Sequence, residues 1–314
     1  MKQLNNGTIH TIFFGTHDFA ARILQGLIDN PLLSVGLVIS RPDEPVGRKQ
    51  IVQKTPVKIL AEKFGIPVEQ PESLKDYGLR TTDYGLGITA QYGGLIPKHI
   101  LEAPTHGILN VHTSLLPKYR GASPVQSAIM NGEKETGITI MKMDEGLDTG
   151  PILLQKKIPI GEHTTAPELE KMLAALGVEA LIEAIPPYLN GTLLPKEQDH
   201  PSATTCQKLT REDGRIDWRR GVRDIYNQYR GLLPWPGVWT MWNGKRIKLI
   251  SLRPAHHVSS PGAFSFLDDH LYIGCADGSV EIMTIQLEGK REMPAEEFVR
   301  GHRNDITEFP SVNE

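Results

Sequence analysis

The sequence predicts an α/β domain with a Rossmann-like, mostly parallel sheet, followed by a small OB-like β-barrel domain. The length of 314 residues suits two domains of roughly 150 residues each. Strand and helix signals alternate over roughly the first 160 residues, a pattern typical of a parallel sheet with helices on both faces. Short strands separated by glycines dominate the C-terminal part, which is typical of a small barrel.

The N-terminal elements alternate clearly. Residues 8–14 are a run of β-branched and aromatic residues that ends at Gly15, so they predict a strand. Asp18 is a candidate N-cap, and apolar residues follow it at helical spacing: Phe19, Ile23, Leu24, Leu27 and Ile28. A second apolar strand is expected at residues 33–40. Residues 56–64 predict a helix that begins with proline, which suits a first helical turn.

The alternation continues through the rest of this domain. Further strands are expected at residues 84–90, 107–112, 136–143 and 151–160. A short helix is expected at 124–130. A long helix is expected at 165–189, with an apolar face formed by Leu169, Leu173, Leu176, Ala180 and Ile185. Active sites of such sheets lie at the carboxyl ends of the strands, so functional residues are expected there.

The character of the chain changes after residue 189. Residues 190–206 contain glycine and prolines without periodicity, so we interpret them as a linker. Strands are then expected at residues 238–242, 246–252, 270–275 and 279–287. We therefore divide the chain into an N-terminal domain of residues 1–189, the linker, and a C-terminal domain of residues 207–314.

Composition excludes several classes of protein. Hydrophobic residues make up 39% of the chain and charged residues 23%, as in a globular protein rather than a disordered or collagen-like one. The sequence has two distant cysteines, which cannot form a disulfide framework or a cysteine-based zinc site. We find neither a membrane-spanning apolar stretch nor a signal peptide, and we expect a cytoplasmic protein that does not bind membranes.

The charge is unevenly distributed along the chain. Its net charge is -3, but residues 205–253 hold 11 lysines and arginines against 4 aspartates and glutamates. Residues 254–314 reverse this ratio, with 4 against 11. A basic block of this size suits contact with a polyanion such as a nucleic acid, and a solvated surface is the equally weighted alternative.

Asn110 and His112 form the first candidate site. They are two residues apart near the end of a predicted strand, so their side chains lie on the same face. An amide beside an imidazole can hold and polarise a carbonyl group while a proton moves. The alternative interpretation is a capping asparagine and a histidine buried in the core.

The loop Met143–Gly150 supplies carboxylates, among them Asp144 and Asp148. Their spacing does not match an EF-hand, so we expect no metal site. A carboxylate that orients His112 explains the loop better, because a catalytic imidazole needs a partner that fixes its tautomer. Residues 15–20 lack the second glycine of a dinucleotide-binding turn, so no dinucleotide cofactor is expected.

These motifs resemble those of the methionyl-tRNA formyltransferases, a family of the 10-formyltetrahydrofolate-dependent formyltransferase superfamily. The resemblance rests on Asn110-Val-His112, on Ser114-Leu-Leu-Pro117 with Arg120-Gly121, and on Leu147-Asp-Thr-Gly150. Further matches are spread over the chain: Phe14-Gly-Thr16, Arg41-Pro-Asp43, Thr55-Pro-Val-Lys58, Arg215-Ile-Asp-Trp218 and Pro234-Trp-Pro236. The matches near the C-terminus favour this family over shorter folate-dependent relatives.

The resemblance implies an enzyme that transfers a formyl group from 10-formyltetrahydrofolate to the α-amino group of methionyl-initiator-tRNA, without a metal ion. It implies that Asn110 and His112 hold and polarise the formyl oxygen, and that Asp148 orients His112. It also implies a folate site, for which core packing is the alternative at the apolar positions. The residues of that site are Tyr92, Gly94, Leu95, Ile96, Ser114, Leu115, Leu116, Pro117 and Asp144.

Contacts with tRNA are expected in two regions. By resemblance, the loop Arg41–Lys54 reaches the acceptor stem, and the OB-like domain provides a nucleic-acid platform. The basic residues expected to take part are Arg41, Arg48, Lys49, Lys54, Arg215, Arg219, Lys245, Arg246 and Lys248. We expect a monomer. Two other functions stay open at this point: a formyltransferase for an amino nucleotide-sugar, and a non-catalytic protein that binds tRNA or folate.

Overall fold

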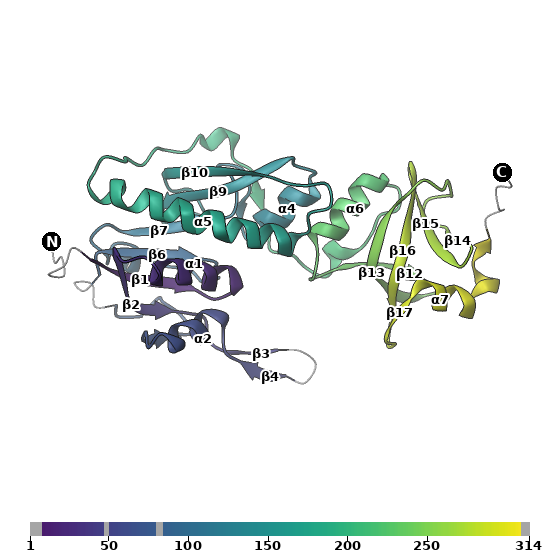
Figure 1. Cartoon of the computed structure of the whole chain (residues 1–314), viewed down its shortest axis with the longest axis horizontal. Coiled ribbons are helices and arrows are strands. Elements are labelled where there is room, and N and C mark those ends of the chain that lie inside the picture. The colour runs from purple at the N-terminus through teal and green to yellow at the C-terminus, as the bar shows by residue number, and fades with distance from the viewer. Residues whose placement is uncertain (1–7, 47–49, 80–83, 309–314) are drawn as a thin grey trace. The chain divides into compact units, whose positions relative to one another are not determined.

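The computed structural model describes residues 8–46, 50–79 and 84–308, and Figure 1 shows their helices and strands. The chain forms two compact units. The first unit consists of Met1–Pro124, Glu135–Pro159 and Glu168–Cys206, and the second of Val125–Lys134, Ile160–Pro167 and Gln207–Glu314. The domain boundaries at residues 189 and 206 stay a prediction.

A seven-stranded sheet lies at the centre of the first unit, counted over the residues that the structure describes. Its strands, in spatial order, are β10 (Ile152–Pro159), β9 (Glu135–Lys142), β7 (Ile108–His112), β6 (Leu86–Ala90), β1 (Ile9–Gly15), β2 (Leu33–Ile39) and β5 (Val68–Glu69). The strands from β7 to β5 are parallel, whereas β9 and β10 are antiparallel additions at one edge. This confirms the predicted Rossmann-like, mostly parallel sheet.

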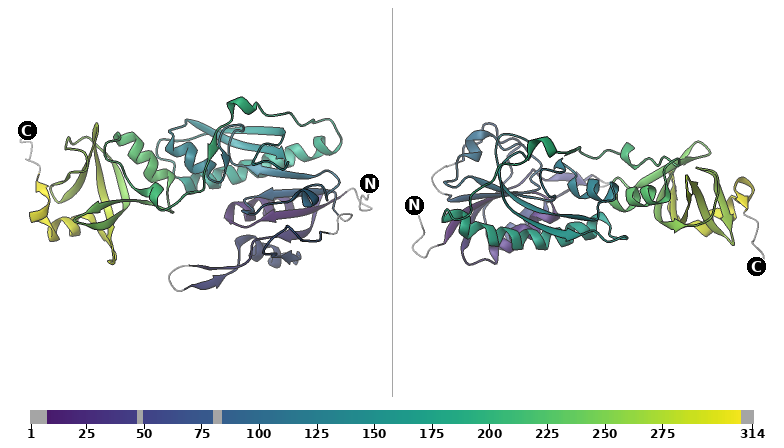
Figure 2. Two further views of the ribbon diagram at one scale, coloured as in Figure 1. Left: turned by 180° about the vertical axis from the view of Figure 1, so that it is seen from behind. Right: turned by 90° about the horizontal axis from the view of Figure 1, so that it is seen from above.

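Two helices lie side by side on one face of this sheet, α1 (Asp18–Ile28) and α5 (Ala166–Leu189), as Figures 1 and 2 show. Gly26 allows their close approach, because a Cβ at this position would lie 2.4 Å from Val178 Cγ1. On the sheet side of α5, a Cβ at Gly177 would lie 3.0 Å from Val111 Cγ1 of β7. The opposite face of β7 is therefore turned away from α5.

The helix starts follow local rules. α2 (Pro56–Lys63) begins after Thr55, whose hydroxyl accepts a hydrogen bond from Lys58 N at 3.2 Å. At α1 the N-cap is His17 rather than the expected Asp18. Asp18 lies in the first turn instead, where a negative charge suits the positive end of the helix dipole. A short helix, α3 (Lys98–Leu101), follows β6.

Among its described residues, the first unit also holds two small two-stranded sheets. β3 (Glu44–Val46) and β4 (Ile51–Gln53) pair antiparallel and form what we call the β3–β4 arm. β8 (Arg120–Gly121) pairs in parallel with β11 (Thr205–Cys206), which belongs to the segment expected as a linker. That segment therefore forms part of the first unit up to residue 206.

By length and apolar composition alone, α5 could cross a membrane. Leu169, Leu173 and Ala180 of this helix are buried within the first unit, and a core helix passes the same test.

The second unit is built on a mostly antiparallel sheet. Its described strands follow the order β12 (Val238–Trp242), β13 (Lys245–Ala255), β16 (Gly278–Leu287), β15 (His270–Cys275), β14 (Phe264–Leu267) and β18 (Thr307–Glu308), and β17 (Glu292–Pro294) also pairs with β16. α6 (Val222–Gly231) lies against β13 and β16, and α7 (Ala295–Gly301) against β15 and β16. Most of α4 (Pro124–Met130) also belongs to this unit. The predicted C-terminal β domain is confirmed.

Candidate active site

Asn110 and His112 lie on the face of β7 that is turned away from α5. Val111, between them, points toward Gly177 of α5. Because side chains alternate along a strand, Asn110 and His112 point to the other face. His112 is the last residue of β7, and only 6% of it is exposed.

Asp148 reaches both side chains from the connection between β9 and β10. Its Oδ1 accepts a hydrogen bond from Asn110 Nδ2 at 3.3 Å and lies 3.7 Å from His112 Nδ1. Its Oδ2 accepts a hydrogen bond from Gly121 N at 2.8 Å. The structure thus brings Asn110, His112 and Asp148 into one cluster.

A backbone carbonyl fixes the ring of His112. Its Nε2 lies 3.0 Å from the carbonyl oxygen of Tyr119. A carbonyl oxygen only accepts hydrogen bonds, so Nε2 carries a proton. In the neutral ring Nδ1 then holds the lone pair, and this atom faces Asp148. A proton taken up at Nδ1 would be paired with the Asp148 carboxylate, which would stabilise the resulting imidazolium.

The run Ser114–Pro117 is held against the sheet. Thr139 Oγ1 donates to Ser114 O at 2.7 Å, and Gln155 Nε2 donates to Leu116 O at 2.8 Å. Ser114 is fully buried, and 3% of Leu116 is exposed. Leu115 packs on β9, where a Cβ at Gly137 would lie 2.6 Å from its Cδ2. These residues serve packing, and the expected folate contacts of Ser114 and Leu116 stay a prediction.

The other residues of the expected folate site lie on two loops. Tyr92 is buried, and its carbonyl accepts a hydrogen bond from Thr16 Oγ1 at 2.8 Å. Burial raises the pKa of the Tyr92 hydroxyl, although Arg41 beside it acts in the opposite direction. Ile96 is also buried, whereas Leu95 is 82% exposed. Asp144 turns inward on its own loop and accepts a hydrogen bond from Gly146 N at 3.0 Å.

Sequence reasoning missed one buried side chain of this site, Gln198. Its Nε2 donates to the backbone carbonyls of Asp148 at 2.9 Å and Gly150 at 2.7 Å. Its sequence neighbours Glu197 and Asp199 are exposed. A single buried glutamine between exposed polar residues leaves no periodic signal, so the sequence offers nothing by which to find it.

Two of the basic residues expected around the β3–β4 arm, Arg41 and Lys54, have partners within the first unit. Arg41 Nη1 donates to Glu72 O at 2.9 Å, and Lys54 Nζ lies 2.7 Å from Glu62 Oε2. Arg48 and Lys49 lie outside the described residues, so their expected contacts stay predictions.

In the second unit, three of the expected basic residues gather on one face. Lys248 is directly opposite Trp239 across β12 and β13, and Arg246 is opposite Met241, so these side chains share the face away from the core. The guanidinium carbon of Arg246 lies 4.0 Å from the Trp239 ring centroid, and that of Arg215 lies 5.8 Å from it. We call Arg215, Trp239, Met241, Arg246 and Lys248 the outer face of β12–β13.

The remaining two expected contacts lie elsewhere on the second unit. Lys245 is opposite Trp242, which faces the core side of the sheet. Arg219 is paired with Asp217 at 2.8 Å.

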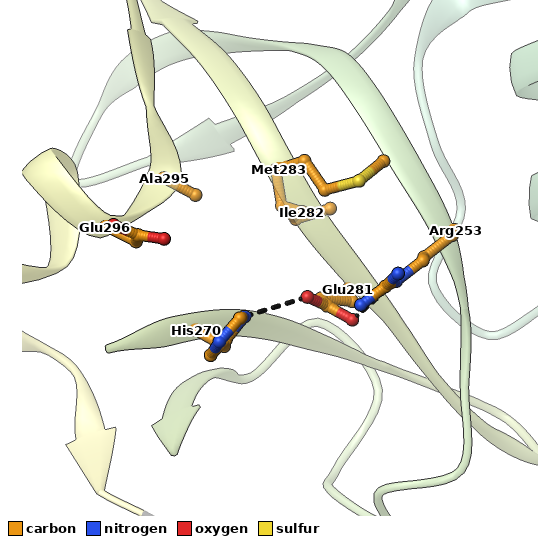
Figure 3. Close-up of a pocket in the computed structure, with 7 residues that line it drawn as sticks. All are labelled: Arg253, His270, Glu281, Ile282, Met283, Ala295 and Glu296. Carbon is orange, nitrogen blue, oxygen red and sulfur yellow. Dashed lines mark hydrogen bonds and ion pairs between the residues drawn. The ribbon is translucent and has the colours of Figure 1, made fainter. Parts of the chain in front are cut away.

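A pocket of about 240 Å³ in the second unit is distinct from both sites (Figure 3). Glu281 lies in it with 8% of its side chain exposed. Its carboxylate accepts hydrogen bonds from Arg253 Nε at 2.8 Å and His270 Nδ1 at 2.9 Å. Burial alone would raise the pKa of Glu281, but the hydrogen bonds from Arg253 and His270 outweigh it and lower the pKa.

Within the described residues, no group of three or more histidine, cysteine, aspartate and glutamate side chains could hold a metal ion.

Comparison with known proteins identifies the family of this chain. A formyl transferase family model matches residues 9–185, and a model of the formyl transferase C-terminal domain matches residues 208–303. A methionyl-tRNA formyltransferase from Caldicellulosiruptor saccharolyticus is 41% identical over 302 residues, which covers 93% of this chain and 96% of that relative. The chain belongs to the methionyl-tRNA formyltransferase family.

Another methionyl-tRNA formyltransferase, from Acidobacterium capsulatum, is 42% identical over 299 residues and covers 93% of this chain and 96% of its own. Solved structures share the fold of this chain. The N-formyltransferase from Helicobacter canadensis, in complex with folinic acid and dTDP-3-aminofucose, has a TM-score of 0.66 at 22% identity over 88% of this chain and 98% of that one. HypX from Aquifex aeolicus, in complex with tetrahydrofolic acid, has a TM-score of 0.65 at 18% identity over 97% of this chain and 49% of that one.

Proposed function

We propose that this chain transfers the formyl group of 10-formyltetrahydrofolate to the α-amino group of methionyl-initiator-tRNA, with Asn110, His112 and Asp148 as its catalytic residues. The observation that carries the assignment of these residues is the position of Asp148 Oδ1, 3.3 Å from Asn110 Nδ2 and 3.7 Å from His112 Nδ1. Family membership supports the reaction, and this cluster offers the groups that the reaction needs.

His112 Nδ1 is the atom to which we assign the proton transfer. A free α-amino group has a pKa of about 8, so much of it must lose a proton before it can attack. When the amine attacks the formyl carbon, a carbon–nitrogen bond forms and the oxygen becomes an oxyanion. His112 takes the proton from the attacking nitrogen, and Asp148 stabilises the imidazolium. The proton then passes to the donor nitrogen as its bond to the formyl carbon breaks.

Asn110 is suited to hold the formyl oxygen. One hydrogen of its amide nitrogen is donated to Asp148, and the second has no partner in the part of the chain that the structure describes. A donor aimed at a developing oxyanion is typically worth about 3–4 kcal/mol of transition-state stabilisation. None of these steps requires a metal ion.

For the folate donor we propose the surface beside this cluster. Leu95 and Leu147 are large apolar side chains that are 82% and 67% exposed, on the two loops that border the cluster. Lys98 Nζ, at the start of α3, lies 2.8 Å from Glu145 Oε1 and joins this helix to the loop that carries Leu147. Exposed apolar side chains with a few polar groups between them suit a bicyclic ring that needs one face covered.

For the tRNA we propose the outer face of β12–β13 together with the β3–β4 arm. Arg246 and Arg215 lie over the buried ring of Trp239, with Lys248 beside them, so this face offers positive charge for phosphates. A cytoplasmic, monomeric enzyme that does not bind membranes completes the proposal.

The choice of acceptor tests this function. The purified chain is incubated with 10-formyltetrahydrofolate and either methionyl-initiator-tRNA or a dTDP-amino sugar, and the formylated product is measured. We expect formylation of the tRNA alone. Formylation of the sugar alone would assign the chain to amino-sugar modification. Binding of tRNA without any transfer would favour a non-catalytic role.

A further inference from the structure

The segment 190–206 runs along the first unit beside the candidate catalytic residues. Ile152 and Lys196 exchange backbone hydrogen bonds of 2.7 and 2.8 Å. Further along, Arg120 N donates to Thr204 O at 2.8 Å. A Cβ at Gly121 would lie 2.1 Å from Cys206 O, so the segment approaches β8 more closely than any other residue there would allow.

Gln198 uses its whole amide group in this contact. Only 5% of the residue is exposed. Its Nε2 donates to Asp148 O and Gly150 O, and its Oε1 accepts hydrogen bonds from Arg120 Nε at 3.1 Å and Nη2 at 2.7 Å. The Gln198 side chain therefore joins the loop that carries Asp148 to Arg120 of β8, the residue before Gly121.

Asp148 is held both at its backbone and at its carboxylate. Gln198 binds its backbone carbonyl, and Gly121 N binds its carboxylate. Asp148 has a φ of 52°, in the left-handed region that residues other than glycine occupy only with support from their surroundings. Because its Oδ1 already lies 3.7 Å from His112 Nδ1, an outward shift of the loop would separate the carboxylate from the ring.

We propose that Gln198 is a positioning residue that holds the Asp148 carboxylate in front of His112 and Asn110. The inference rests on the proposed catalytic role of Asp148. Rates of proton transfer fall steeply when reacting groups shift by about 1 Å, so loss of the Gln198 amide acts on the chemical step rather than on substrate binding.

Two substitutions separate this role from simple support of the fold. Gln198→Glu keeps an acceptor for the buried Arg120 guanidinium but replaces the donor to Asp148 O and Gly150 O by a repelling oxygen. Gln198→Met keeps the volume and removes both interactions. We expect Gln198→Glu to lower kcat roughly tenfold or more, with KM for tRNA and folate changed less than about twofold. The matched control is Glu197→Gln, next to it and exposed, which keeps full activity.

A double-mutant cycle with Asp148→Asn decides the matter. If Gln198 acts through Asp148, Gln198→Glu costs no further activity in the Asp148→Asn enzyme. An equal loss in both backgrounds, or an unchanged kcat in both Gln198 variants, would overturn the proposal. If Gln198→Glu strongly lowers the melting temperature, the kcat of Gln198→Met is used for the comparison instead. Full activity of Asp148→Asn alone would instead refute the catalytic assignment itself.

Discussion

The ring of His112 owes its direction to a backbone atom, the carbonyl oxygen of Tyr119, rather than to the carboxylate beside it. Asp148 is therefore free to stabilise charge at Nδ1 without having to fix the tautomer, since Nε2 is already committed as a donor. Two partners, Tyr119 and Asp148, therefore share the role that the residue pattern predicts for Asp148 alone.

The catalytic set can be tested by single substitutions. Asn110→Ala, His112→Ala and Asp148→Asn are each expected to lower kcat at least about tenfold, because each removes a group that acts in the transition state. Single-turnover rates measure the effect, and melting temperatures show that the variants are folded. Near-normal rates in two of the three would mean that the chemistry takes place elsewhere.

The sequence reveals part of this residue-scale arrangement. The spacing of Asn110 and His112 places them on one face of a strand, and a carboxylate in the following loop is found by its residue type. The carbonyl that contacts His112 belongs to Tyr119, whose backbone has a φ of 59°. The residue type tyrosine does not predict such a conformation. Gln198 is hidden for a similar reason, since burial of a lone polar side chain has no pattern.

Glu281 predicts a pH-dependent contribution to stability (Figure 3). Its pKa is lowered in the folded chain, so its contribution is complete above its unfolded pKa of about 4.3 and is lost as the pH falls through the folded value. We expect Glu281→Gln to cost about 1 kcal/mol of unfolding free energy at pH 7, since solvent screens the half-exposed Arg253 and His270.

Urea unfolding at pH 7 and at pH 3 measures this difference. The gap between the wild-type chain and Glu281→Gln is expected to shrink at the lower pH. Glu296→Gln, which lines the same pocket and pairs with exposed Arg300, is the control and leaves stability nearly unchanged. A gap that stays constant with pH would contradict the proposed ion pairs.

At the scale of elements, the base of the β3–β4 arm is fixed by a compact polar network. Lys58 Nζ on α2 donates to Asp43 Oδ2 and Gln70 Oε1, both at 2.6 Å. Gln70 Nε2 in turn donates to Arg41 O and Asp43 Oδ1, both at 2.7 Å. These contacts set the direction in which the chain leaves the sheet toward the arm.

Loosening this network predicts a selective defect in tRNA use. Lys58→Met is expected to raise KM for tRNA roughly threefold or more, while KM for folate and kcat change less, because the network orders the arm and not the catalytic cluster. Steady-state kinetics with each substrate varied in turn measure the split. Lys63→Met, on the last turn of the same helix, is the matched control. Equal rises in both KM values would contradict a role confined to the arm.

The outer face of β12–β13 makes a second prediction at this scale. The double variant Arg246→Ala and Lys248→Ala should weaken tRNA binding and lower the slope of log affinity against log salt by about 2, one unit for each lost phosphate contact. Lys245→Ala with Arg219→Ala removes the same charge from other places and is expected to act less. Binding titrations at several salt concentrations compare the two, and equal effects would reduce the outer face to a general contribution of charge.

For the molecule as a whole, the sequence predicts the fold class because strand and helix patterns alternate over a long N-terminal stretch. Short strands separated by glycines then follow in the C-terminal part. The residue pattern gives no direction for β9 and β10, although the short connection between them, without a helix, is typical of antiparallel neighbours. α6 and α7 were not expected at all. The polar α6 sequence buries Asn227, Gln228 and Arg230, which propensity alone would place at the surface.

Arg230 gives a prediction for the second unit alone. It is 2% exposed, and its Nη1 donates to Gly161 O at 3.0 Å and Thr164 O at 2.8 Å. Arg230→Met leaves these acceptors unpaired and is expected to cost about 2–4 kcal/mol of unfolding free energy. All four tryptophans lie after residue 206, so their fluorescence reports on this unit. An unchanged fluorescence midpoint in urea would contradict the prediction.

The make-up of the second unit also orders events during protein synthesis. Residues 125–134 and 160–167 leave the ribosome before residues 222–231, whose Arg230 and Gly231 complete their packing. Ile129, which is fully buried in the finished chain, lacks its packing partner α6 until that helix has been synthesised. A nascent chain that stalls near residue 206 therefore displays apolar surface of the kind that chaperones bind and aggregates recruit, so the last third of the chain also protects what was made before it.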